Sequence, residues 1–186
     1  MLLLGAIAVL IYSFVVGNYL LLAIPAIFFG LVLYLTVIVR RDAAYVPTPE
    51  PTVRRMLEMA EVKSGETLYD LGSGDGRIVL TAARDFGAKA IGVELDKGLI
   101  SVSMRNIKAA NLEDKAKIIK GNFYETDLRD ADVVTLYLRQ NTNDRLGVKF
   151  KKELRPGSRV VSYTFVMTGW KPTKADNESH LYLYTI

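Results

Sequence analysis

The fold is decided at residues 69–77, which read Tyr-Asp-Leu-Gly-Ser-Gly-Asp-Gly-Arg. Residues 67–69 have the β propensity and apolarity of a buried parallel strand, and apolar residues recur at helical spacing after the stretch. The glycines at 72, 74 and 76 permit positive φ and let a ligand approach the backbone. A helix that begins near Gly76 would point its free N–H groups at that ligand. The stretch therefore predicts a strand, a cofactor-binding turn and a helix.

Two acidic residues indicate which cofactor this turn binds. Asp70 ends the first strand, and Glu94 follows the next predicted strand, residues 88–93, where a carboxylate would accept hydrogen bonds from ribose hydroxyls. The spacing Gly-x-Gly-x-Gly departs from the dinucleotide pattern Gly-x-Gly-x-x-Gly. Together these features resemble class I S-adenosylmethionine-dependent methyltransferases, whose cofactor has no pyrophosphate. The alternative is a glycine turn in some other α/β domain.

Composition separates an apolar start from an ordinary remainder. Half of the 186 residues are hydrophobic and the formal net charge is +4, yet residues 1–39 contain no acidic, basic or histidine residue. The remainder, about 145 residues, is long enough for one well-buried core. The chain has no cysteine, which excludes disulfides and thiol chemistry. We expect no metal site.

The apolar start is too long for one straight membrane span. As an unbroken helix, residues 1–39 would measure about 58 Å, against about 30 Å for a bilayer core. Gly17-Asn18 is the best turn signal, so we predict a transmembrane hairpin with helices at 2–16 and 19–39. One span with a shallow N-terminal segment is the alternative, and a cleaved signal peptide is disfavoured. Arg40-Arg41 predicts a cytoplasmic catalytic domain and two cytoplasmic termini.

After the apolar start, the chain alternates helices and strands. Prolines at 47, 49 and 51 mark a connector that leads into a short amphipathic helix. The following alternation predicts an α/β fold with a Rossmann-like, doubly wound parallel sheet, closed by an antiparallel C-terminal edge strand or hairpin at 181–186. We therefore divide the chain into an anchor (1–41), a connector with the first helix (42–60) and a cofactor-binding domain (61–186).

From Tyr45 onward the chain resembles the small protein-lysine methyltransferases within class I. This group includes the enzymes that modify ATP synthase c-subunits and the archaeal broad-specificity enzymes. The resemblance rests on Tyr45-Val46-Pro47-Thr48 with Met56-Leu57, on residues 69–78, on Gly92-Val93-Glu94, on Thr135-Leu136-Tyr137-Leu138 with Asn143, and on residues 153–163.

The resemblance implies S-adenosylmethionine as cofactor and a role for each matching residue. Asp70, Gly72 and Gly74 would line its methionine part, and Glu94 would bind its ribose. Thr48 and Gly76 would also lie at the cofactor, and Asn122 and Phe123 would flank the adenine. From the residues alone, Asn122 is equally a turn cap and Phe123 equally a core residue.

On the acceptor side, the resemblance points to Tyr137 and Asn143, which follow the fourth strand. Tyr137 is alternatively a core residue, and Tyr163 is a further candidate for the wall of an acceptor channel. The Asn/Asp-Pro-Pro-Tyr motif of amide and adenine methylases is absent there, which disfavours DNA or glutamine as acceptor. His180, the only histidine, lies in a terminal strand and is expected at the surface.

The sequence thus predicts a membrane-anchored protein-lysine methyltransferase whose partner is a membrane-associated protein with an acceptor lysine. We expect no nucleic-acid partner, because the chain has no long basic cluster. Two alternatives remain, a methyltransferase for a membrane lipid or quinone and an anchored module that binds the cofactor without catalysis.

Overall fold

The computed structural model describes residues 2–17, 20–39 and 45–186. The chain divides into two compact units, residues 1–42 and 43–186. Residues 45–60 of the connector and first helix fall within the second unit. The finer division of the chain at 41 and 60 stays a prediction.

The N-terminal unit contains two helices, α1 (Leu2–Val16) and α2 (Leu20–Val39), within one residue of the predicted bounds. The prediction that they cross a membrane is not borne out. Over the part of the chain that the structure describes, no helix combines the length and apolarity that a span requires. The 15 residues of α1 extend about 22 Å, which is shorter than a bilayer core of about 30 Å. Asn18, Tyr19 and Arg40-Arg41, on which the hairpin and its orientation depended, lie outside the described residues.

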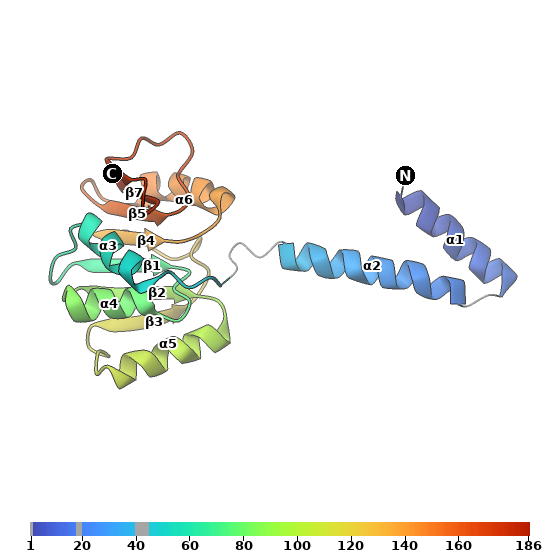
Figure 1. The fold of residues 1–186 in the computed structure, drawn as a ribbon, viewed down its shortest axis with the longest axis horizontal. Coiled ribbons are helices and arrows are strands. Elements are labelled where there is room, and N and C mark those ends of the chain that lie inside the picture. Colours follow the sequence, from blue (N-terminus) through green and yellow to red (C-terminus); the bar gives the residue numbers. More distant parts are fainter. Residues whose placement is uncertain (1, 18–19, 40–44) are drawn as a thin grey trace. The chain divides into compact units, whose positions relative to one another are not determined.

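The second unit is built on one seven-stranded sheet of order β3-β2-β1-β4-β5-β7-β6 (Figure 1). Strands β1 to β5 are parallel, and β7 and β6 add antiparallel pairings at one edge. The predicted antiparallel pairing at the C-terminus is therefore confirmed, although the edge strand is β6, which the sequence did not predict. The strands are β1 (Thr67–Leu71), β2 (Lys89–Glu94), β3 (Ala116–Lys120), β4 (Val133–Leu136), β5 (Arg159–Tyr163), β6 (Lys174–Asp176) and β7 (Leu181–Thr185).

The order of the strands fixes the position of the site. After β1 the chain builds outward through β2 and β3, then returns to the other side of β1 to form β4 and β5. Ligands of open α/β sheets bind at the carboxyl ends of the strands where the order reverses in this way. The reversal lies between β1 and β4, so the turn at 72–76 is at that point.

Helices cover both faces of the sheet (Figure 1). On one face pack α3 (Glu50–Met59), α4 (Arg77–Asp85) and α5 (Lys97–Ala109), and on the other packs α6 (Gln140–Glu153). Alternation along β1 assigns its side chains to the two cores, with Leu68 facing α3 and α4 and Tyr69 facing the α6 side. The short amphipathic helix predicted after the prolines is α3, and four residues in it and at its C-cap are fully buried at the spacing i, i+3, i+4, i+7: Val53, Met56, Leu57 and Ala60.

Gly92 in β2 gives a testable steric constraint beneath the glycine turn. A Cβ atom at Gly92 would lie 2.5 Å from Ser73 Oγ and 2.6 Å from Ile118 Cδ1. We expect Gly92→Ala to lower the free energy of unfolding by about 1–3 kcal/mol, the usual cost of overpacking. Gly121→Ala is the matched control, since its nearest atom would be 3.8 Å away. Equal stability of the two variants in chemical denaturation would contradict this prediction.

Candidate functional site

The glycine turn forms hydrogen bonds with the end of β2 and with Ser103 of α5. The N–H groups of Gly72 and Ser73 both donate to the Val93 carbonyl, at 2.9 and 3.1 Å. Gly74 has φ +55°, a left-handed conformation that favours glycine, and its carbonyl accepts a 2.8 Å bond from Ser103 Oγ of α5. Gly76, also left-handed, is the N-cap of α4. The strand, turn and helix predicted from the sequence are therefore present.

Glu94 connects this turn to the end of β2. Its Oε2 accepts the N–H of Gly74 at 2.9 Å, while its Oε1 accepts those of Leu95 and Asp96 at 2.8 and 2.9 Å. A carboxylate oxygen has two acceptor positions, so Oε2 can accept one further donor, such as a hydroxyl. The predicted ribose residue is thus also part of the framework that shapes the turn, a role that the sequence did not reveal.

Asp70 is a buried carboxyl group at the carboxyl end of β1. Burial raises its pKa to about 7, although the Thr135 hydroxyl donates a 2.9 Å hydrogen bond to Oδ1 that favours the charged form, and the nearby carboxylates of Glu94 and Asp75 raise the pKa further. Perturbed carboxyl groups of this kind concentrate at functional sites. A buried acid with pKa near neutrality is suited to meet a cationic group of a ligand.

Residues 45–48 lie against the outside of the turn. A Cβ atom at Gly74 would lie 2.9 Å from Cε2 of Tyr45, so the tyrosine ring packs directly on the turn. Arg77 donates a 2.8 Å bond to the carbonyl of Thr48, and its Nε and Nη2 donate three bonds to the carboxylate of Asp75. Partial burial opposes the charge of Asp75, but the bonds from Arg77 hold the pKa of Asp75 below its ordinary value. Thr48, a predicted cofactor residue, is consequently fixed beside the turn.

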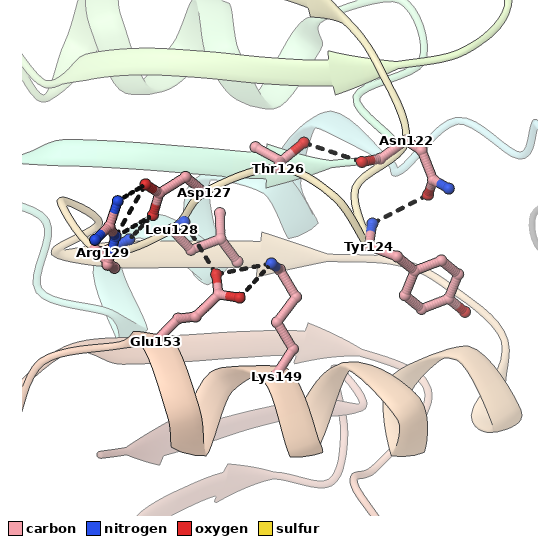
Figure 2. A network of polar contacts seen from close by, with 8 residues as sticks. All are labelled: Asn122, Tyr124, Thr126, Asp127, Leu128, Arg129, Lys149 and Glu153. Carbon is pink, nitrogen blue, oxygen red and sulfur yellow. Dashed lines mark hydrogen bonds and ion pairs between the residues drawn. The ribbon is translucent and has the colours of Figure 1, made fainter.

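The predicted adenine residues lie in the loop between β3 and β4. The Oδ1 atom of Asn122 accepts the N–H of Tyr124 at 3.0 Å, and its carbonyl accepts Thr126 Oγ1 at 3.1 Å (Figure 2). Phe123 is buried in the core on the α6 side. Asn122 is thus a turn cap and Phe123 a core residue, and their contact with the adenine stays a prediction.

A hydrogen bond to Glu153 of α6 connects this loop to the helix. Lys149 donates to both oxygens of Glu153 at 2.7 Å, and Glu153 accepts the N–H of Leu128 at 3.3 Å (Figure 2). Asp127 and Arg129 pair with each other at the loop surface. The loop is therefore tied both to α6 and to itself.

On the acceptor side, two tyrosines meet at the carboxyl ends of β4 and β5. The ring centroids of Tyr137 and Tyr163 are 4.5 Å apart. Leu138, which follows Tyr137, would lie 3.0 Å from a Cβ atom at Gly72, so this wall adjoins the glycine turn. Asn143, predicted to position the acceptor, is fully buried and bonds to Ser162 and Phe165 instead.

The structure therefore brings Asp70, Glu94 and the glycine turn together at one edge of the sheet, with Tyr137 beside them. Sequence reasoning missed the contact of Tyr45 with Gly74 and the bond from Arg77 to Thr48. It also missed Ser103, which supports the turn. These contacts join residues 29 positions apart in the chain, and no periodicity or motif encodes such pairs.

Comparison with known proteins agrees with this geometry. The sequence pattern of the ANTKMT methyltransferase domain matches residues 70–174, more than half of the chain. A protein-lysine N-methyltransferase of Saccharolobus islandicus (strain REY15A) is 48% identical over 149 residues, which cover 76% of this chain and 92% of the relative. The adenine nucleotide translocase lysine N-methyltransferase of Mus musculus is 30% identical over 139 residues, which cover 75% of this chain and 60% of that protein.

A solved structure shows the same fold with a cofactor product. The crystal structure of an RNA methyltransferase from Salinibacter ruber in complex with S-adenosyl-L-homocysteine superposes with a TM-score of 0.74 at 45% identity. The superposition covers 76% of this chain and 94% of that one. The chain therefore belongs to the ANTKMT methyltransferase domain family, within the class I S-adenosylmethionine-dependent methyltransferases.

Proposed function

We propose that the protein is an S-adenosylmethionine-dependent protein-lysine N-methyltransferase. The observation that carries this proposal is its 48% identity with the protein-lysine N-methyltransferase of Saccharolobus islandicus over 92% of that protein. The matched family pattern contains Asp70, the glycine turn and Glu94, the residues around which the site is built.

The chain offers a place for each part of the cofactor. Asp70, Gly72 and Gly74 would hold the methionine part, and the free acceptor position of Glu94 Oε2 would bind a ribose hydroxyl. Gly76 is the N-cap of α4, so the N-terminus of this helix, with its free N–H groups, lies at the same turn. Thr48, Asn122 and Phe123 would complete the site. When bound, the cofactor supplies a methyl group already activated on a sulfonium, so the protein's task is mainly alignment.

The acceptor lysine must arrive as a neutral amine. Enclosure in a narrow apolar passage lowers the pKa of an ammonium group, because it disfavours the charged form. Tyr137 and Tyr163, both half-buried beside the glycine turn, supply an aromatic wall for such a passage. The Tyr137 hydroxyl would orient the amine.

RNA is a second candidate acceptor, because the 45% identical Salinibacter ruber protein is described as an RNA methyltransferase. A lipid or quinone, or no acceptor at all, are the further alternatives from the sequence. The purified full chain should be incubated with tritiated S-adenosylmethionine in three separate reactions. One contains protein, one RNA and one lipid, each from cells that lack the gene. We expect label in protein, recovered as methyllysine after acid hydrolysis. Label in RNA or lipid alone, or in none of the three, would overturn the proposal.

Removal of the Tyr137 hydroxyl tests the acceptor side directly. Tyr137→Phe keeps the ring that packs on Tyr163 and should lower kcat by about 2-fold to 10-fold, the value of one hydrogen bond. The Kd for S-adenosylhomocysteine should stay unchanged, because the proposed cofactor residues Asp70, Gly72 and Gly74 lie at the end of β1. Tyr182→Phe, in β7, is the matched control. A parallel loss of cofactor affinity would show that Tyr137 belongs to the cofactor site instead.

We further propose that the enzyme acts at a membrane, with the catalytic domain on the cytoplasmic side and a membrane-associated protein as substrate. Support comes from α1 and α2, which carry exposed large apolar side chains, including Phe14, Phe28 and Phe29, and from the absence of charge in residues 1–39. Fractionation of cells that express the full chain tests this proposal. We expect recovery with membranes, and recovery of the whole protein in the supernatant would contradict it.

A further inference from the structure

The segment after β5 contains a strained turn next to the acceptor-side aromatic wall. Thr164 has φ +69°, although β-branched residues rarely adopt positive φ. The N–H of Phe165 donates to the Tyr163 carbonyl at 2.9 Å across this residue. The pattern is that of the rare γ-turn with positive φ at its centre, which is a strained conformation. Thr164 is exposed, so no packing of its own side chain compensates for the strain.

A buried amide of α6 holds this γ-turn in place. Asn143 is fully buried, and its Nδ2 donates to Ser162 Oγ and to the Phe165 carbonyl, each at 2.9 Å. Ser162, equally buried, donates its own hydroxyl to the same Phe165 carbonyl. Hydrogen bonds from Asn143 and Ser162 thus hold the backbone at Phe165, directly after Thr164.

Further hydrogen bonds hold residues 166–168, which follow the γ-turn. Gln140 of α6 donates to the Val166 carbonyl at 2.8 Å, and Asp144 accepts the N–H of Thr168 at 2.7 Å. From β7, the Tyr184 hydroxyl accepts the N–H of Met167 at 3.1 Å. Strained backbone persists only where the surroundings over-determine it, and such sites cluster where function needs a fixed geometry.

The geometry points to Asn143 as a positioning residue that acts through the γ-turn. We propose that Asn143 and Ser162 hold the Tyr163–Phe165 turn in its strained form, and that the turn fixes the Tyr163 ring against Tyr137 to shape the passage for the acceptor lysine. This inference rests on the proposed function. It assigns Asn143 no contact with the acceptor, because its side chain is buried behind the turn.

A double-mutant cycle of thermal stability tests whether Asn143 holds the γ-turn, and it needs no activity assay. Thr164→Gly removes the strain at little cost to packing, so we expect it to raise the thermal unfolding midpoint of the full chain by roughly 2–4 °C. Asn143→Asp keeps the shape of the side chain but cannot donate to Ser162 or Phe165. In the Asn143→Asp background the turn keeps the bond from Ser162 but loses both bonds from the amide, so Thr164→Gly should give a smaller gain. Equal gains in the two backgrounds would overturn the inference.

Kinetics test the consequence for the acceptor. With protein from cells that lack the gene as acceptor, Asn143→Asp should raise the apparent KM by about fivefold, the equivalent of one hydrogen bond, and leave the Kd for S-adenosylhomocysteine unchanged. In a Tyr163→Leu background the same substitution should add little, because the ring through which Asn143 acts is gone.

Ser158→Ala is the control for a general loss of stability. It removes a buried hydroxyl-to-carbonyl bond of 2.8 Å at the opposite end of β5 and should not change the KM. An unchanged KM in Asn143→Asp would overturn the inference and leave the proposed function intact. Absence of methyllysine with the wild-type chain would overturn both.

Discussion

Asp70→Asn should make the protein more stable than the wild type at pH 8 but not at pH 4. The pKa of Asp70 in the fold is about 7, above its ordinary value of 3.8, because burial penalises the charge. Below pH 3.8 the carboxyl group is protonated in both the folded and the unfolded protein and costs the fold nothing. As the pH rises from 3.8 through 7, the unfolded protein loses this proton first, so the free energy of unfolding falls. A shift of about three units corresponds to roughly 4 kcal/mol between these limits.

The measurement is chemical unfolding of both proteins from pH 4 to pH 8, followed by the fluorescence of Trp170, the only tryptophan. The difference in unfolding free energy should change across this window. Asp114→Asn, at an exposed carboxylate, is the control and should show no such trend. Parallel pH profiles for wild type and Asp70→Asn would contradict a raised pKa of Asp70 in the folded protein.

Glu94→Ala should weaken binding of S-adenosylhomocysteine by about 1.5–3 kcal/mol, the range for hydrogen bonds to a charged group, or about 10-fold to 150-fold. Two losses combine in this variant. The ribose loses its acceptor, and the N–H groups of Gly74, Leu95 and Asp96 lose the carboxylate that fixes the turn. We therefore expect an effect near the upper end of the range.

Calorimetric titration of the full chain measures this effect. Glu113→Ala, at an exposed position before β3, removes the same charge away from the turn and should bind as the wild type does. Glu94→Gln keeps one acceptor oxygen, so its affinity for S-adenosylhomocysteine should lie between those of Glu94→Ala and Glu113→Ala. Unchanged affinity in a folded Glu94→Ala variant would show that this carboxylate does not hold the cofactor.

Much of the fold could be predicted from the sequence because it follows local patterns. Apolar spacing located α3 and its buried face, and the strand, glycine turn and helix around Gly76 appear where propensity and φ requirements place them. The antiparallel β7 followed from the short chain left after β5.

The remainder depended on contacts between distant residues. Asn143 looked like an acceptor residue because it follows the fourth strand, yet the α6 turn directs it inward to Ser162. The membrane-spanning hairpin was inferred from the uncharged length of residues 1–39 and the turn signal Gly17-Asn18, and the described helices do not meet the requirements of a span. The strain at Thr164 has no signal in the sequence, because threonine is not a residue that favours positive φ.

The most direct test of lysine methylation is mass spectrometry of all proteins from cells that carry the wild-type gene, the Glu94→Ala variant or no gene. The account predicts at least one lysine that is methylated with the wild type, unmethylated without the gene and strongly reduced with Glu94→Ala. If every protein lysine is methylated alike in the three strains, while an RNA nucleoside or a lipid loses its methyl group, protein lysine is not the acceptor.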